Sequence, residues 1–137
     1  MFLILGLGLM SIGLLYLTID EFMPYHSEAI QADWSALDGN YQGLILGLLK
    51  ALGSGAFVAG FASTFMAIAS YRNSVKPFLV LLPLVSTGYS ALLFYATLTV
   101  YTSTPGNPPL LLSFASVATG LAASALLLYS MRLHGET

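Results

Sequence analysis

Four long apolar runs restrict what this sequence can fold into. Each run is long enough for a helix that crosses a bilayer, which needs about 20 residues. None shows the alternating pattern of a barrel strand. Because backbone groups inside lipid must be hydrogen-bonded within their own segment, the runs are expected to be helices. The sequence therefore predicts an all-α, four-helix transmembrane bundle in one domain, residues 1–137, with spans at about 1–19, 41–71, 77–100 and 110–131.

The composition agrees with a membrane location. Of the residues, 57% are hydrophobic and only 7% are charged, whereas soluble domains carry roughly 25% charged residues. The net charge of -2 offers no basic surface for nucleic acid. The sequence has no cysteine, which excludes disulfides, thiolate metal ligands and cysteine nucleophiles. The first run has no basic residues at its start and is followed by no small-residue cleavage site, so it does not have the features of a signal peptide. We expect it to be retained as a helix.

The charged residues between the runs predict the orientation. Arg72, Lys76 and Arg132 lie in the second connection and the tail, and the third connection has no charge. Short basic loops stay on the cytoplasmic side. Both termini are therefore expected in the cytoplasm, with the loop 20–40 outside a cell (inner) membrane. That loop holds no base and five acids, namely Asp20, Glu21, Glu28, Asp33 and Asp38.

The outer loop is expected to be partly helical. Pro24 suits the first turn of a helix, so the segment "PYHSEAIQA" can form a short helix on the outer surface. "SALD" matches a capping box in which Ser35 and Asp38 bond each other's backbone, and the second span would then begin near Ser35. The following "DGN" favours a turn instead, which leaves the start of that helix open.

Lys50 lies inside the second span, about 12 Å below the outer interface. Small residues flank it at helical spacing: Gly43, Gly47, Gly53 and Ser54. Such stripes pack against other helices, so Lys50 is expected to face the bundle interior. A buried ammonium needs a partner. Because Asp20 and Glu21 end the first span, we predict an ion pair between Lys50 and one of them.

The outer loop and Lys50 together form the best candidate for a ligand site. Such a cluster fits an anionic or amphipathic ligand, such as a lipid headgroup or a quinone. A structural tie between the loop and the bundle is the competing interpretation. The candidate ligand-binding residues are Lys50, Glu21, Asp20, His26, Tyr25, Glu28 and Trp34.

Metal and nucleophile chemistry have no motif in this sequence. His26 and His134 are expected on opposite sides of the membrane, and no HExxH spacing exists. No elbow motif marks a serine as a nucleophile. No catalytic residue, metal or cofactor is therefore predicted. No acid lies inside a span, which argues against a transporter.

The segments "EFMPYHSEAIQADWSALD" and "GLLKALGSG" resemble small uncharacterised four-helix bacterial inner-membrane proteins, a resemblance that implies no activity and no functional residues. The first functional interpretation is a non-enzymatic accessory or structural subunit, or a ligand-binding bundle. The second is a membrane-embedded enzyme or a lipid- or quinone-binding protein that uses the outer cluster. The third is an oligomeric small transporter.

Small residues on the fourth span point to helix packing. Ser116 with Gly120, and Ala118 with Ala122, have the spacing of close-packed membrane helices. These faces either close the bundle or dock another protein. Besides the bilayer, the expected partners are therefore a second copy of the chain or a larger membrane complex.

Overall fold

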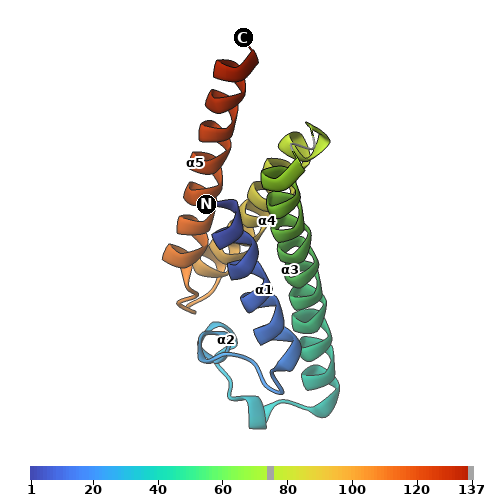
Figure 1. Cartoon of the computed structure of the whole chain (residues 1–137). Coiled ribbons are helices and arrows are strands. Elements are labelled where there is room, and N and C mark those ends of the chain that lie inside the picture. Colours follow the sequence, from blue (N-terminus) through green and yellow to red (C-terminus); the bar gives the residue numbers. More distant parts are fainter. Residues whose placement is uncertain (74–75, 136–137) are drawn as a thin grey trace.

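The computed structural model describes residues 1–73 and 76–135, and within these residues it contains helices and no strand (Figure 1). The predicted all-α fold is confirmed, and the long helices begin and end within a few residues of the four apolar runs. The helices are α1 (Phe2–Thr18), α2 (Pro24–Ile30), the short 3₁₀ helix η1 (Trp34–Ala36), α3 (Gly39–Asn73), α4 (Lys76–Ser103) and α5 (Leu110–Gly135).

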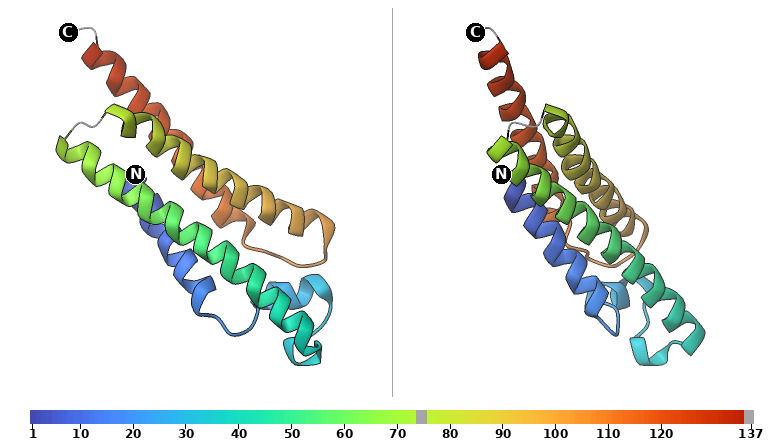
Figure 2. Two further views of the ribbon diagram at one scale, coloured as in Figure 1. Left: turned by 90° about the vertical axis from the view of Figure 1, so that its right-hand side faces the viewer. Right: turned by 45° about the vertical axis from the view of Figure 1, so that its right-hand side comes forward.

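Helices α3, α4 and α5 are each long and apolar enough to cross a membrane. Helix α1 is apolar but has 17 residues, which is about 25 Å of helix and slightly less than a hydrocarbon core of about 30 Å. The last turns of α5 lie at one end of the bundle and α2 and η1 lie at the other, and α1 begins part-way between them (Figures 1 and 2).

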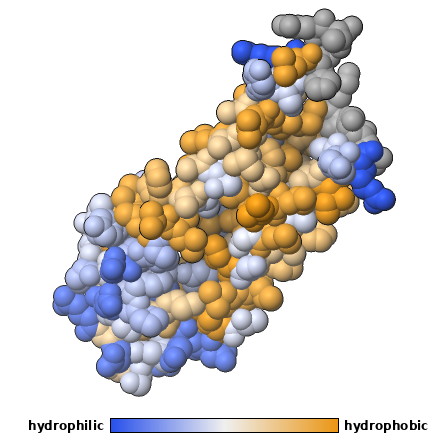
Figure 3. All heavy atoms as spheres, turned by 60° about the vertical axis from the view of Figure 1, so that its left-hand side comes forward, coloured by the Kyte–Doolittle hydropathy of each residue, from blue (hydrophilic) through white to orange (hydrophobic). Residues whose placement is uncertain are grey.

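The surface of the bundle is that of a membrane protein. Large apolar side chains are exposed along the long helices, among them Leu44, Phe61, Leu92 and Leu128. On the face shown in Figure 3, apolar side chains cover the middle of the molecule, a broad polar region lies at one end and a few hydrophilic residues lie at the other. A continuous apolar surface of this size suits contact with lipid rather than water.

Helices α1 and α3 form an antiparallel pair built on four glycines. A Cβ atom at Gly13 would lie 2.7 Å from the carbonyl oxygen of Gly53, and one at Gly60 would lie 2.6 Å from the carbonyl oxygen of Gly6. Real Cβ atoms do not approach other atoms so closely, so the separation of the two backbones requires glycine. Small residues permit this close approach between membrane helices, where packing rather than water exclusion drives association.

The predicted small-residue stripe around Lys50 is only partly used. A Cβ atom at Gly43 or Gly47 would meet nothing within 4 Å, so the expected packing of this pair is wrong for the described chain. Gly53 does pack, against α1. The physical reason is the length of α1, which ends at Thr18 and leaves the first turns of α3 without a neighbour on that side.

The other helix pairs use small and hydroxylated residues. Gly120 of α5 fits against Thr87 of α4, whose hydroxyl oxygen lies 3.3 Å from that of Ser124. Part of the small face predicted on the fourth span therefore closes the bundle. Helix α4 joins α3 through Tyr89, whose hydroxyl donates to the carbonyl oxygen of Leu52 at 3.1 Å. Helix α1 makes few contacts with α4 and α5.

The loop 20–40 is partly helical, as predicted, and Pro24 occupies the first turn of α2. The predicted capping box at Ser35 is wrong, because Ser35 lies in the single turn of η1. Helix α3 begins at Gly39, and the side chain of Asp38 accepts the backbone N–H of Asn40 at 2.9 Å. The Asp38 carboxylate thus stabilises the first turn, where backbone N–H groups have no partner in the helix.

Candidate functional site

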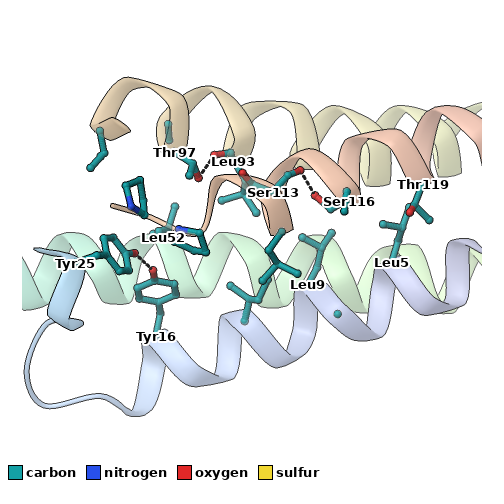
Figure 4. A pocket seen from close by; sticks show the side chains of 18 of the residues that line it. Leu5, Leu9, Tyr16, Tyr25, Leu52, Leu93, Thr97, Ser113, Ser116 and Thr119 are labelled. Atoms are coloured by element: carbon teal, nitrogen blue, oxygen red, sulfur yellow. Dashed lines mark hydrogen bonds between the residues drawn. The ribbon is translucent and has the colours of Figure 1, made fainter. Parts of the chain in front are cut away.

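A cavity of ≈ 390 Å³ lies between α1 on one side and α4 and α5 on the other (Figure 4). Its volume falls in the range of small-molecule sites, about 300–1,000 Å³. Leu52 contributes to the lining from α3. The wall is mainly apolar and includes Leu5, Leu9 and Ile12 of α1, Leu93 and Val100 of α4, and Leu112 of α5.

The cavity follows from how the helices pair. The glycines hold α1 against α3, and Gly120 holds α5 against α4, so α1 and α5 do not close on each other. Small residues also line the space where larger ones would fill it, namely Gly8, Ala96 and Ala115. A Cβ atom added at Gly8 would meet nothing within 4 Å. The cavity therefore exists because α1, α4 and α5 each place a small residue in its wall.

Two tyrosines close the end of the cavity that lies next to α2. The hydroxyl oxygens of Tyr16 and Tyr25 lie 2.6 Å apart and share a hydrogen bond (Figure 4). The ring of His26 lies beside that of Tyr25, with 4.0 Å between the ring centroids. All three side chains line the cavity. The cavity thus has an apolar body and a polar end.

Helix α2 is held in place by the connection between α4 and α5. A carboxylate oxygen of Glu28 accepts the backbone N–H of Asn107 at 3.2 Å. A Cβ atom at Gly106 would lie 2.7 Å from the carbonyl oxygen of Tyr25 and 2.8 Å from Cβ of Ala29. The connection therefore approaches α2 so closely that only glycine fits, and this contact positions Tyr25 over the cavity.

The polar end of the cavity is uncharged near neutral pH. Burial lowers the pKa of His26, and its Nδ1 accepts the backbone N–H of Met23 at 3.0 Å. Burial, followed by the hydrogen bond with Tyr16, raises the pKa of Tyr25. Both effects favour the neutral form, because a charged side chain loses hydration when it is buried. His26 is therefore neutral with its proton on Nε2.

Three of the four remaining hydroxyl groups of the cavity wall are bonded within their own helices, and the fourth is that of Thr119. Thr97 donates to the carbonyl oxygen of Leu93 at 2.8 Å, and Ser113 donates to that of Leu110 at 2.9 Å. Ser116 donates to the carbonyl oxygen of Ser113 at 2.7 Å. These three donors are satisfied within their own helices, so the body of the cavity is mainly a surface for an apolar group.

Of the sequence-predicted candidates, Tyr25 and His26 line the cavity, and Lys50 does not. The Nζ atom of Lys50 donates instead to the carbonyl oxygen of Leu17 at 3.2 Å. In the described part of the chain, Lys50 has no ion pair with Asp20 or Glu21 within 4.0 Å. The predicted ion pair is wrong because both acids are exposed, whereas the last carbonyls of α1 lie within reach and lack a helical partner.

Glu28 and Trp34 stabilise the loop 20–40 rather than line this cavity. The Trp34 ring meets the buried Phe22 ring edge-on, with 4.9 Å between centroids. The carbonyl oxygen of Trp34 accepts the side-chain N–H of Gln42 at 2.8 Å. These contacts join the loop to the start of α3, and they do not involve the cavity.

Sequence reasoning missed Tyr16 and the apolar wall. Tyr16 lies inside the first apolar run, close to its outer end, and its hydroxyl is the partner of Tyr25. A tyrosine at that depth is a usual interfacial residue, which gave no reason to single it out. The wall consists of ordinary apolar residues, and nothing in their order marks those that face an open space.

No protein-family model, curated protein or solved structure matches this chain. Among the described residues, no group of three or more His, Asp or Glu side chains is placed to hold a metal ion. The cavity and its Tyr16, Tyr25 and His26 end are therefore the features from which we infer a function.

Proposed function

We propose that this chain is a small, non-enzymatic membrane protein that binds one lipophilic molecule in the cavity between α1, α4 and α5. The observation that carries this proposal is a mainly apolar cavity of ≈ 390 Å³ that ends in the Tyr16–Tyr25 pair. An apolar wall with a few converging polar groups is the usual form of a small-molecule site. Such a site fits an amphipathic molecule whose polar group lies beside α2.

The proposal includes α1 as a fourth span. Its backbone lies against residues 53–64 of α3, well inside the candidate span Gly39–Arg72. A helix held along a membrane-crossing partner shares the same layer of lipid. Helix α1 is only slightly shorter than the hydrocarbon core is thick, and bilayers adapt to such a difference in length at a modest cost in free energy.

We further propose that both termini lie in the cytoplasm of the cell (inner) membrane and that α2 lies outside. Arg72 and Arg132 support this orientation, because short basic segments stay inside. The chain has no cysteine, so single cysteines at Ser35 and Tyr71, both exposed, test it directly. A membrane-impermeant thiol reagent added to intact cells should label Ser35→Cys and not Tyr71→Cys. The reverse pattern would show the opposite orientation.

The opening of the cavity favours a molecule that enters from the surrounding lipid. Its lining on α1 runs from Ile4 to Tyr16, which is about 18 Å of helix and most of the length of α1. Ile4 and Leu112 line the cavity and remain 72% and 61% exposed. The cavity thus opens sideways, where a lipid chain can enter without leaving the membrane.

Filling the cavity tests the proposal. Gly8→Phe places a ring in the open space, since a Cβ atom at Gly8 meets nothing within 4 Å. Gly43→Phe is the matched control, because Gly43 is equally open but does not line the cavity. The protein is purified in mild detergent, and its bound lipids are extracted and identified by mass spectrometry.

We expect the wild-type protein and Gly43→Phe to retain about one lipophilic molecule per chain, and Gly8→Phe to lose it. Equal lipid content in all three proteins would contradict a site in this cavity. Circular dichroism of each variant shows whether the helical fold is intact.

A further inference from the structure

Two hydrogen-bond donors on residues that line the cavity beside α2 have no protein acceptor among the described residues. In the Tyr16–Tyr25 pair one hydroxyl donates to the other, so one of the two phenolic protons is left over. His26 accepts the N–H of Met23 through Nδ1, which places its own proton on Nε2. One O–H group and one N–H group therefore remain for a ligand.

The lining of the cavity carries no Asp, Glu, Lys or Arg. Lys50 does not line the cavity and is bonded to the carbonyl oxygen of Leu17. Tyr25 and His26 are kept neutral by burial. An ionic headgroup placed among these groups would lose hydration and gain no opposite charge, which is unfavourable.

We propose that the ligand is an uncharged lipid whose polar group is a carbonyl, and that the tyrosine pair and His26 donate hydrogen bonds to its oxygen. This inference rests on the proposed function and names the class of molecule that the cavity takes. A carbonyl oxygen has two lone pairs and no proton, so it complements two donors. A quinone with an isoprenoid chain and an ester of a fatty acyl chain both supply this chemistry.

Four probes with comparable chains separate the alternatives. Methyl tetradecanoate carries a neutral carbonyl, tetradecane carries none, and tetradecanoate at pH 9 carries a charge. Decylubiquinone carries quinone carbonyls. Binding of each probe to the full chain in detergent is measured by titration with native mass spectrometry.

We expect the ester, the quinone or both to bind roughly two- to tenfold more tightly than tetradecane, as one or two hydrogen bonds would give. The tetradecanoate anion should bind more weakly than the ester. Whichever neutral probe binds more tightly identifies the source of the carbonyl, and either result supports the inference.

The double variant Tyr16→Phe/Tyr25→Phe tests the role of the phenols. It should lose most of the preference for a carbonyl while still binding tetradecane, which also shows that the cavity is intact. Each single variant leaves one phenolic proton free and should keep the preference. Tyr95→Phe is the matched control, because Tyr95 is 69% exposed and does not line the cavity.

Three results would overturn the inference: tetradecane binding as tightly as the neutral carbonyl probes, the anion binding more tightly than the ester, or an unchanged carbonyl preference in the double variant. The Gly8→Phe variant distinguishes failure of the carbonyl assignment from failure of the proposed lipid-binding function. If it blocks all probes, the cavity binds lipids and only the carbonyl assignment fails. If it blocks none, both proposals fail.

Discussion

At the scale of single residues, Lys50 shows that a charged side chain can bind to the free carbonyl groups at the end of a helix instead of to an acid. Its ammonium group bonds the carbonyl oxygen of Leu17, in the last turn of α1. That turn has carbonyl groups without helical partners and carries the negative end of the helix dipole. The exposed acids Asp20 and Glu21 keep their hydration instead. Lys50 therefore stabilises the contact between α1 and α3 without an ion pair.

Reversing the charge at position 50 should destabilise the bundle. In Lys50→Glu the hydrogen bond to Leu17 is lost and a carboxylate faces carbonyl oxygens, which should lower the free energy of unfolding by about 1.5–3 kcal/mol. Lys50→Met should cost less, since it also removes an ammonium group from an apolar span. Thermal unfolding in detergent measures both effects. A Glu variant as stable as the Met variant would contradict this role.

The residues of the polar end could be predicted only in part. Tyr25 and His26 stood out because they are polar aromatic groups in the one long connection, and both line the cavity. The partner of Lys50 could not be predicted, because it is a backbone carbonyl that every residue possesses. Tyr16 could not be chosen from sequence, since its importance comes from a hydrogen bond to a residue in another helix.

At the scale of the elements, glycine spacing decides which helices come close. Gly6 and Gly13 are seven residues apart on α1, and they face Gly53 and Gly60, seven apart on α3. Gly43 and Gly47 have the familiar GxxxG spacing but no neighbouring helix. The spacing predicts a stripe of small residues along one side of a helix. Whether a second helix reaches that face depends on where that helix ends.

Adding a methyl group at the α1–α3 contact should therefore be costly. Gly13→Ala would place Cβ 2.7 Å from the carbonyl oxygen of Gly53, so the helices must separate, at a cost of about 1–3 kcal/mol. Gly47→Ala is the control on the open side of α3 and should be neutral or stabilising by up to about 1 kcal/mol through helix propensity. Melting temperatures of the two variants that did not differ would contradict the close contact.

At the scale of the whole molecule, the apolar runs predicted the helices and their order because lipid imposes long, internally bonded segments. The cavity could not be predicted, because it is the space left when α1 follows α3 and α5 follows α4. That space exists because α1 lies close to α3, and α5 close to α4. Residues such as Gly6, Gly60 and Gly120 allow these close contacts. The sequence shows that each of these positions holds a small residue. It does not show between which two helices a space remains.

The most direct measurement is photo-crosslinking of the protein, in lipid vesicles, with an acyl lipid that carries a diazirine on its chain. Binding in the cavity predicts saturable labelling of peptides that contain residues 4–16 of α1 and 112–119 of α5, with the label lost in Gly8→Phe and kept in Gly43→Phe. Labelling that falls instead on lipid-facing residues such as Phe61 and Phe65, and is unchanged by Gly8→Phe, would contradict a lipid site between these helices.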